Sequence, residues 1–211
     1  MIDWNPERYG ATVTRLVAEP RLNELGPGAS NASAYDLLAA IEPAALGAGR
    51  PLKNRAMAEA LCAALWLLHD YLDESHRISQ SLDTLEGSYW HGIMHRREPD
   101  FGNAHYWMRR VPTHPTHPSL LIAGQQLLSE AAPENGNRGG SGAAADDAAL
   151  RPARELLRRP TWSSAAFVDL CESALGGPAP LESLTRRIQQ AEWRLLFDYC
   201  YSEAFGGAPS A

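Results

Sequence analysis

The stretch "ALCAALWLLHDYLDESHRISQ" (residues 60–80) decides the fold of this chain. Apolar residues recur in it at the spacing of one helix face, and the repeated leucines are Leu61, Leu65, Leu68 and Leu72. A stripe with the helical period of about 3.6 residues must face a core. The pattern therefore predicts one long helix over about residues 54–80.

A line of polar residues follows the same helix beside the leucine stripe: His69, Asp73, His76 and Gln80. Residues three and four positions apart share a helix face, so these side chains would point in similar directions. Two interpretations remain open. Either the line is a polar edge in which Asp73 satisfies one histidine, or the second half of the helix lines a pocket.

The rest of the sequence predicts further helices and almost no strand, because sustained period-two runs are absent. The expected helices cover about residues 5–18, 33–41, 84–97, 102–111, 119–131, 161–175 and 181–204. Residues 132–148 are rich in Gly and Ala and aperiodic, which predicts a long surface loop. The loop could separate two domains, but the helices after it are too apolar for the last 63 residues to cover alone. We therefore predict an all-α fold, a single compact helical domain of about six to eight helices over residues 1–211.

The composition limits the class of protein. Hydrophobic residues make up 45% and charged residues 21%, which is typical of a globular chain. A net charge of −6 argues against nucleic-acid binding. The first residues lack the apolar run of a signal peptide, and the longest apolar stretch is too short to span a bilayer. Cys62, Cys171 and Cys200 are far apart in apolar patterns, so we expect buried thiols in a cytoplasmic protein without nucleic-acid or membrane partners.

All seven histidines lie between residues 69 and 117, which is the strongest indication of a site. "HGIMH" places His91 and His95 on one helical face, where they could share a metal ion or a substrate. It differs from the HExxH motif of zinc proteases, because Gly92 occupies the place of the glutamate. We expect the helices at 54–80 and 84–97 to form a hairpin that brings two sets of polar residues together. The predicted metal ligands are His69, His76, His91 and His95, and the predicted catalytic residues are these four with Asp73.

Residues 91–110 carry four arginines and two acidic residues, a formal charge of +2 that leaves −8 for the rest of the chain. Arginine binds carboxylates and phosphates through two parallel hydrogen bonds, so the segment suits a small anion. The predicted ligand-binding residues are Tyr89, Trp90, Arg96, Arg97, His105, Trp107 and Arg109. The alternative is that these arginines are ordinary surface residues, since Lys53 is the only lysine in the chain. Gly87 and Gly92 are poor helix formers, so they predict a close approach of another helix or of a substrate. Asp198 lies in an apolar run, so its carboxylate is expected to pair with a cation of residues 69–109.

Three longer stretches of the sequence are distinctive: "LWLLHDYLDESHRISQ", "GSYWHGIMHRREPDFGNAHYWMRRV" and "EWRLLFDYC". Together they resemble a family of bacterial and fungal hypothetical proteins that share the HGIMHRREPDFGNA block. The resemblance covers roughly residues 60–112 and 184–203. It implies a stand-alone small protein and carries no mechanism with it.

Three functional hypotheses follow. The first is a small enzyme that acts on a polar or anionic molecule, such as a sugar or an organic acid, with histidine and carboxylate as acid and base. The second is a helical-bundle metalloprotein with His and Asp ligands. The third is a non-catalytic module that binds a small ligand. The partner is expected to be a small molecule, and the cofactor is left open, with a divalent metal ion as one expectation.

Overall fold

The computed structural model describes residues 4–19, 21–131, 145 and 147–206, and every regular element in these ranges is helical. The all-α prediction is confirmed, but the helices outnumber the six to eight expected: the described residues hold ten α-helices with defined bounds, further helical residues at 145 and 147–149, and three short 3-10 helices. The α-helices are α1 (Ala11–Val17), α2 (Tyr35–Ala39), α3 (Arg55–Leu68), α4 (Leu72–Ser79), α5 (Leu85–Arg97), α6 (Phe101–Arg109), α7 (His117–Ala131), α9 (Arg151–Leu157), α10 (Ser164–Ala174) and α11 (Ala179–Phe205). The 3-10 helices are η1 (Pro6–Tyr9), η2 (Ala32–Ala34) and η3 (Pro43–Gly47).

Side-chain caps explain where several helices begin. Asn54 accepts a hydrogen bond at the start of α3, Thr84 at the start of α5 and Asp100 at the start of α6. Each cap satisfies a backbone N–H group that has no partner within its own helix. Ser163 caps α10 in the same way, two residues later than the start expected from the sequence.

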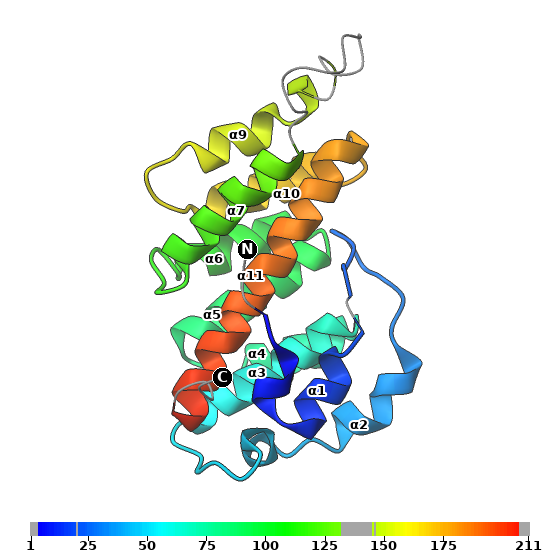
Figure 1. Cartoon of the computed structure of the whole chain (residues 1–211), viewed down its shortest axis with the longest axis vertical. Helices are drawn as coiled ribbons and strands as arrows, with labels where there is room; N and C mark the ends of the chain where they lie inside the picture. Colours follow the sequence, from blue (N-terminus) through cyan, green and yellow to red (C-terminus); the bar gives the residue numbers. More distant parts are fainter. Residues whose placement is uncertain (1–3, 20, 132–144, 146, 207–211) are drawn as a thin grey trace.

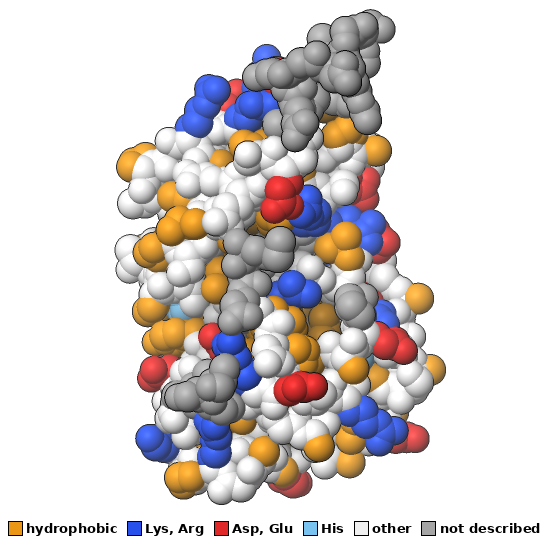
Figure 2. Space-filling view, viewed as in Figure 1, with side chains coloured by type: hydrophobic (Ala, Val, Ile, Leu, Met, Phe, Trp, Pro, Cys, Tyr) orange, Lys and Arg blue, Asp and Glu red, His pale blue; other side chains and the backbone are white. Residues whose placement is uncertain are grey.

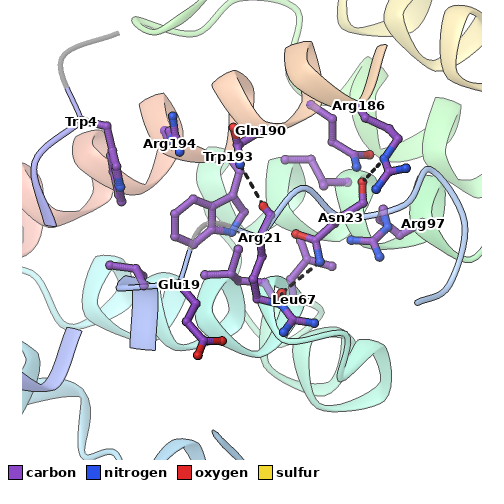
Figure 3. A pocket seen from close by; sticks show the side chains of 14 residues that line it. Trp4, Glu19, Arg21, Asn23, Leu67, Arg97, Arg186, Gln190, Trp193 and Arg194 are labelled. Atoms are coloured by element: carbon purple, nitrogen blue, oxygen red, sulfur yellow. Dashed lines mark hydrogen bonds between the residues drawn. The ribbon is translucent and has the colours of Figure 1, made fainter. Parts of the chain in front are cut away.

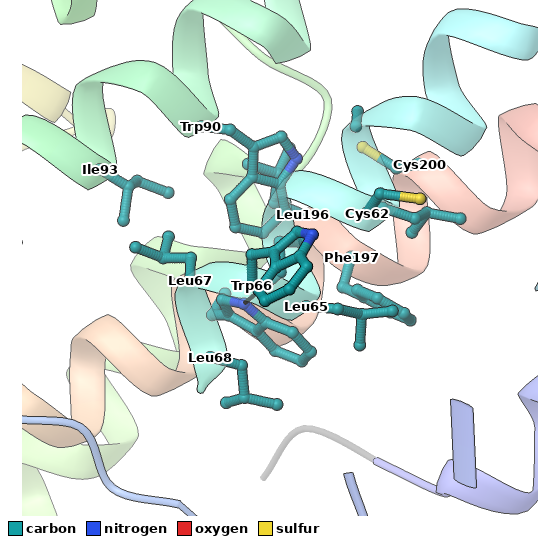
Figure 4. Close-up of a cluster of buried hydrophobic side chains, with 14 of the residues drawn as sticks. Cys62, Leu65, Trp66, Leu67, Leu68, Trp90, Ile93, Leu196, Phe197 and Cys200 are labelled. Atoms are coloured by element: carbon teal, nitrogen blue, oxygen red, sulfur yellow. Dashed lines mark hydrogen bonds between the residues drawn. The ribbon is translucent and has the colours of Figure 1, made fainter. Parts of the chain in front are cut away.

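The helices surround two clusters of buried apolar side chains (Figure 1). The larger cluster joins α1, α3, α5 and the second half of α11, and Figure 4 shows part of it, with Trp90, Leu67 and Phe197 close together. The smaller cluster joins α7, α9, α10 and the first half of α11. Because α11 runs through both clusters, this one helix ties the two ends of the molecule together (Figure 1).

Helix α5 is buried along almost its whole length, from Glu86 to Arg97. It contacts α3 and α4 on one side and α6 on the other. Helix α11 is the longest of the described helices, and 14 of its 27 residues are buried. The more completely buried helix is the polar α5, so its charged and imidazole groups must find partners inside the protein.

The single helix predicted for residues 54–80 is wrong. Helix α3 ends at Leu68 and α4 begins at Leu72, with a corner at residues 69–71 in which Asp70 has a φ of 62°. The carbonyl of Leu68 accepts hydrogen bonds from Arg21 (3.2 Å) and Asn23 (2.9 Å) instead of from the next helical turn. These donors lie far away in the sequence, so a helical period within residues 54–80 could not reveal the break.

Most of the loop predicted at residues 132–148 lies outside the described residues. Within it, residues 145, 147 and 148 are helical, and Asp147 pairs with Arg154 of α9. Basic and acidic side chains are interspersed over the face shown in Figure 2. Among the described helices, none has both the length and the apolar character needed to cross a membrane.

Candidate metal centre

Three histidines from two neighbouring helices converge in the structure. His76 comes from α4, while His91 and His95 lie one turn apart on α5. One ring nitrogen from each can be chosen so that the three atoms lie within 4.8 Å of one another. The centroid of the His91 ring is 4.7 Å from that of His95 and 4.7 Å from that of His76. The hairpin of α4 and α5 thus brings together three of the histidines that the sequence named.

Close packing of α5 against its neighbours holds the two histidines in place. A Cβ atom added to Gly92 would lie 3.0 Å from the Cε atom of Met108 on α6. A Cβ atom added to Gly87 would lie 2.4 Å from the carbonyl oxygen of Leu82. Gly92 therefore marks the close approach of another helix, one of the two roles that the sequence predicted, whereas Gly87 lies against the connection that precedes its own helix.

His91 is the central member of the group. Its side chain is buried at 3% exposure, and neither ring nitrogen has a hydrogen-bond partner among the described residues. Burial, with smaller contributions from His95 and His76, lowers the pKa of His91 to about 3. The ring is therefore neutral near pH 7 and offers a lone pair, the form in which histidine binds a metal ion.

In the described part of the chain, the ring nitrogens of His91 have no partner, whereas the charged side chains on the same helix are paired. Arg96 forms a buried ion pair with Glu192 of α11, and Arg97 forms one with Asp70. A buried polar group without a partner costs about 1–3 kcal/mol, so such groups are rare in folded proteins. A ligand that accepts the lone pair of His91 would remove this cost.

His95 has carboxylates on the far side of its ring. Its Nδ1 atom lies 3.2 Å from Glu98 and 3.8 Å from Asp100, and neither contact is a hydrogen bond. Burial lowers the pKa of His95, and the two carboxylates oppose this shift. A proton on Nδ1 would face Glu98 and would leave the lone pair of Nε2 free for a ligand.

Two predicted site residues do not join this group. His69 lies in the corner after α3, where its Nε2 atom contacts the carbonyl of Leu16 at 2.9 Å and its Nδ1 atom contacts Asn31 at 3.0 Å. Asp73 is exposed on α4 and is not part of the histidine group. The corner at residues 69–71 takes His69 off the line that a continuous helix would have formed, and Asp73 follows the corner on α4 but is exposed there, so the expected convergence of both with His91 and His95 is wrong.

The arginines predicted to bind an anion are mostly engaged within the protein. Arg96 is fully buried with Glu192, and Arg97 donates to Asp70 and to the carbonyl of Gly26. Arg109 is exposed at the end of α6. Two of the four arginines of the segment therefore neutralise buried carboxylates.

Most of the aromatic and imidazole residues predicted to bind a ligand also have partners elsewhere in the protein. Tyr89 donates to Glu192, and Trp90 is fully buried in the larger cluster. His105 pairs with the exposed Asp169 of α10 at 3.0 Å. Trp107 alone among these four contacts the histidine group, because its indole stacks on His91.

A small cavity lies beside Arg97, and no histidine is among the described residues that line it (Figure 3). Its volume is about 40 Å³, and its walls include Trp4, Arg21, Trp193 and Arg194. Pockets for drug-sized ligands usually measure about 300–1,000 Å³. This cavity has room for water rather than for a sugar or an organic acid.

Sequence reasoning missed the acidic partners. Glu192 is the buried carboxylate of α11 that pairs with Arg96, whereas Asp198 is half-buried and accepts a hydrogen bond from Tyr9 at 3.0 Å. The prediction that Asp198 pairs with a cation of residues 69–109 is therefore wrong. Glu98 follows His95 by three residues, and this helical spacing was a signal that could have identified it.

Comparisons with family models, with curated proteins and with solved structures find no match. The similarity to bacterial and fungal proteins with the HGIMHRREPDFGNA block therefore stays a prediction. The function is inferred from the geometry of the histidines.

Proposed function

We propose that this protein is a metalloprotein in which His76, His91 and His95 bind one divalent transition-metal ion. The observation that carries this proposal is His91, a buried neutral imidazole with two unpaired nitrogens beside two other imidazoles. A metal ion would use one of these nitrogens and would link α4 to α5.

The donor atoms favour Zn²⁺ and its neighbours in the first transition series. Imidazole nitrogen suits Zn²⁺, Co²⁺, Ni²⁺ and Cu²⁺, whereas Mg²⁺ and Ca²⁺ prefer oxygen ligands. In a tetrahedral zinc site with Zn–N bonds of about 2.05 Å, the nitrogens lie about 3.3 Å apart. The present group spans up to 4.8 Å, so small side-chain rotations would complete the site.

Three protein ligands leave a coordination position for water or a substrate, as in catalytic zinc sites. We propose that this position takes a small polar molecule, and that the protein is an enzyme acting on it. A metal ion supplies Lewis acidity and makes bound water more acidic. Since Arg96 and Arg97 are engaged with Glu192 and Asp70, the metal ion rather than an arginine pair would bind an anionic group of the substrate.

The setting proposed for this activity is the cytoplasm. The three cysteines are free and buried, which suits a reducing compartment. The net charge of −6 supports a small-molecule partner rather than a nucleic acid.

The test is metal binding by protein purified without a histidine tag and stripped with a chelator. Calorimetric titration with Zn²⁺, and the visible spectrum with Co²⁺, should show one ion per chain in the parent. His91→Ala and His95→Ala should each lose this binding, while His105→Ala, which removes a histidine paired with Asp169, should retain it. Elemental analysis of the untreated protein identifies the native ion. Equal binding by the parent, His91→Ala and His95→Ala would show that the three histidines are not the ligands.

A further inference from the structure

Asp70 lies at the corner between α3 and α4, and side chains from other parts of the chain converge on its carboxylate. It has a left-handed backbone with a φ of 62°, and it is only 8% exposed. Its carboxylate accepts hydrogen bonds from Arg21 at 3.2 Å and from Asn23 at 3.1 Å, and it forms an ion pair with Arg97. A non-glycine residue rarely adopts this conformation, so these contacts must compensate for the strain.

The main chain of the corner is fixed as well. Ser30 donates to the carbonyl of Asp70 at 2.9 Å, and the N–H of Asn31 donates to the carbonyl of His69 at 3.0 Å. A Cβ atom added to Gly28 would lie 2.8 Å from the Asp70 carboxylate, so the N-terminal segment approaches it closely. These contacts set the direction in which α4 leaves the corner.

Arg97 connects this corner to the helix that carries the other two histidines. It lies two residues after His95 on α5, and its guanidinium also donates to the carbonyl of Gly26 at 3.1 Å. The ion pair therefore joins the beginning of α4 to the C-terminal end of α5 (Figure 3 shows Arg97 beside Arg21 and Asn23). His76 is placed relative to His91 and His95 through this connection.

The metal site requires an accurate position of His76 relative to His91 and His95. His76 lies five residues beyond the corner residue Tyr71, about 8 Å along a helix that rises about 1.5 Å per residue. A swing of about 15° at the corner would move His76 by roughly 2 Å over that length. Metal–ligand distances tolerate deviations of only about 0.2 Å, so His76 could follow such a swing only by leaving its favoured side-chain conformation, which would weaken metal binding.

We propose that Asp70 is a positioning residue for the metal centre, acting through His76. This inference rests on the proposed function. Asp70 touches none of the three histidines, but it would raise the metal affinity by fixing the position of His76.

The experiment is a double-mutant cycle between Asp70→Asn and His76→Ala. Asparagine tolerates the left-handed conformation and keeps one acceptor oxygen, so the fold should survive while the charge that holds Arg97 is lost. Zn²⁺ affinity should fall about tenfold in Asp70→Asn, the usual scale for a residue that supports a metal ligand. In the His76→Ala background, titrated at the higher Zn²⁺ concentrations that a site of two histidines needs, the same substitution should change the affinity by less than about twofold, because energetically coupled sites are not additive. Asp169→Asn, which removes the carboxylate that pairs with His105, should leave the affinity of the parent unchanged.

The outcomes separate the two proposals. Absence of Zn²⁺ binding by the parent would overturn the proposed function and this inference together. Binding by the parent with an equal loss from Asp70→Asn in both backgrounds, or with no loss in either, would overturn the inference alone. Circular dichroism and thermal melting check the fold of each variant. If Asp70→Asn does not fold, Arg97→Lys replaces it in the same cycle, because lysine keeps the charge but loses the donor geometry that joins Asp70 and Gly26.

Discussion

The indole ring of Trp107 lies on the imidazole ring of His91, with centroids 4.0 Å apart and planes 22° apart. The imidazole ring of His91 is also stacked with that of His95, with centroids 4.7 Å apart and planes 17° apart. Trp107 thus covers the buried histidine from the side of α6. This contact gives the proposed metal centre a spectroscopic reporter within the native sequence.

Binding of Cu²⁺ should quench the fluorescence of Trp107. The ion would lie one imidazole ring away from the indole, within the short range over which a paramagnetic ion quenches. In a titration, Trp107→Phe should lose most of the Cu²⁺-dependent change seen in the parent. Trp162→Phe, which removes a tryptophan from the smaller cluster, should retain it. Equal quenching in all three proteins would place the ion elsewhere.

Glu98→Gln should weaken Zn²⁺ binding by about tenfold, because the carboxylate near Nδ1 orients the His95 ring and makes it a better donor. The dissociation constant measured by competition with a chelator dye checks this expectation. Asp83→Asn is the matched control, since Asp83 is fully exposed and pairs with Arg110. A Glu98→Gln protein with the affinity of the parent would mean that Glu98 has no influence on the ligand.

Arg96→Met should destabilise the fold by about 3–5 kcal/mol, because it leaves the buried Glu192 carboxylate without its cation. Arg55→Met removes an exposed partner of Glu59 and should cost less than about 1 kcal/mol. Urea unfolding curves of both variants give the comparison. The double variant Arg96→Met/Glu192→Leu should recover part of the loss, and equal effects of the two single variants would contradict the role of the buried pair.

Stability should fall as the pH is lowered from about 6.5 toward 4, and His117 contributes to this fall together with the other histidines whose pKa is lowered by burial. Burial, with a smaller contribution from His114, lowers the pKa of His117 to about 4 in the folded protein. The unfolded chain binds the proton at its ordinary pKa of about 6.5, so the contribution of His117 is fully present above that pH and is lost below it. The midpoint of urea unfolding of metal-free protein, measured at several pH values, checks this. His117→Gln should flatten the dependence, and an unchanged slope in that variant would assign the effect to other groups.

The sequence alone determined the helical class, most of the helices and the pair of histidines on α5. These properties depend on residues three or four positions apart, and a helix places such residues on one face whatever surrounds it. The same local rule located His76 on a helix and the glycines of α5 at close approaches. It also identified the segment in which the candidate site lies.

Tertiary structure decided which of these residues meet. Arg21 and Asn23 end α3 at Leu68 from more than 40 residues away, and the corner that results takes His69 out of the group and leaves His76 in it. Partners distant in the sequence also decided that Arg96 is a buried ion-pair residue rather than an anion ligand. The physical reason is that hydrogen bonding and burial depend on which atoms are close in space, whereas the helical period reports only neighbours along the chain.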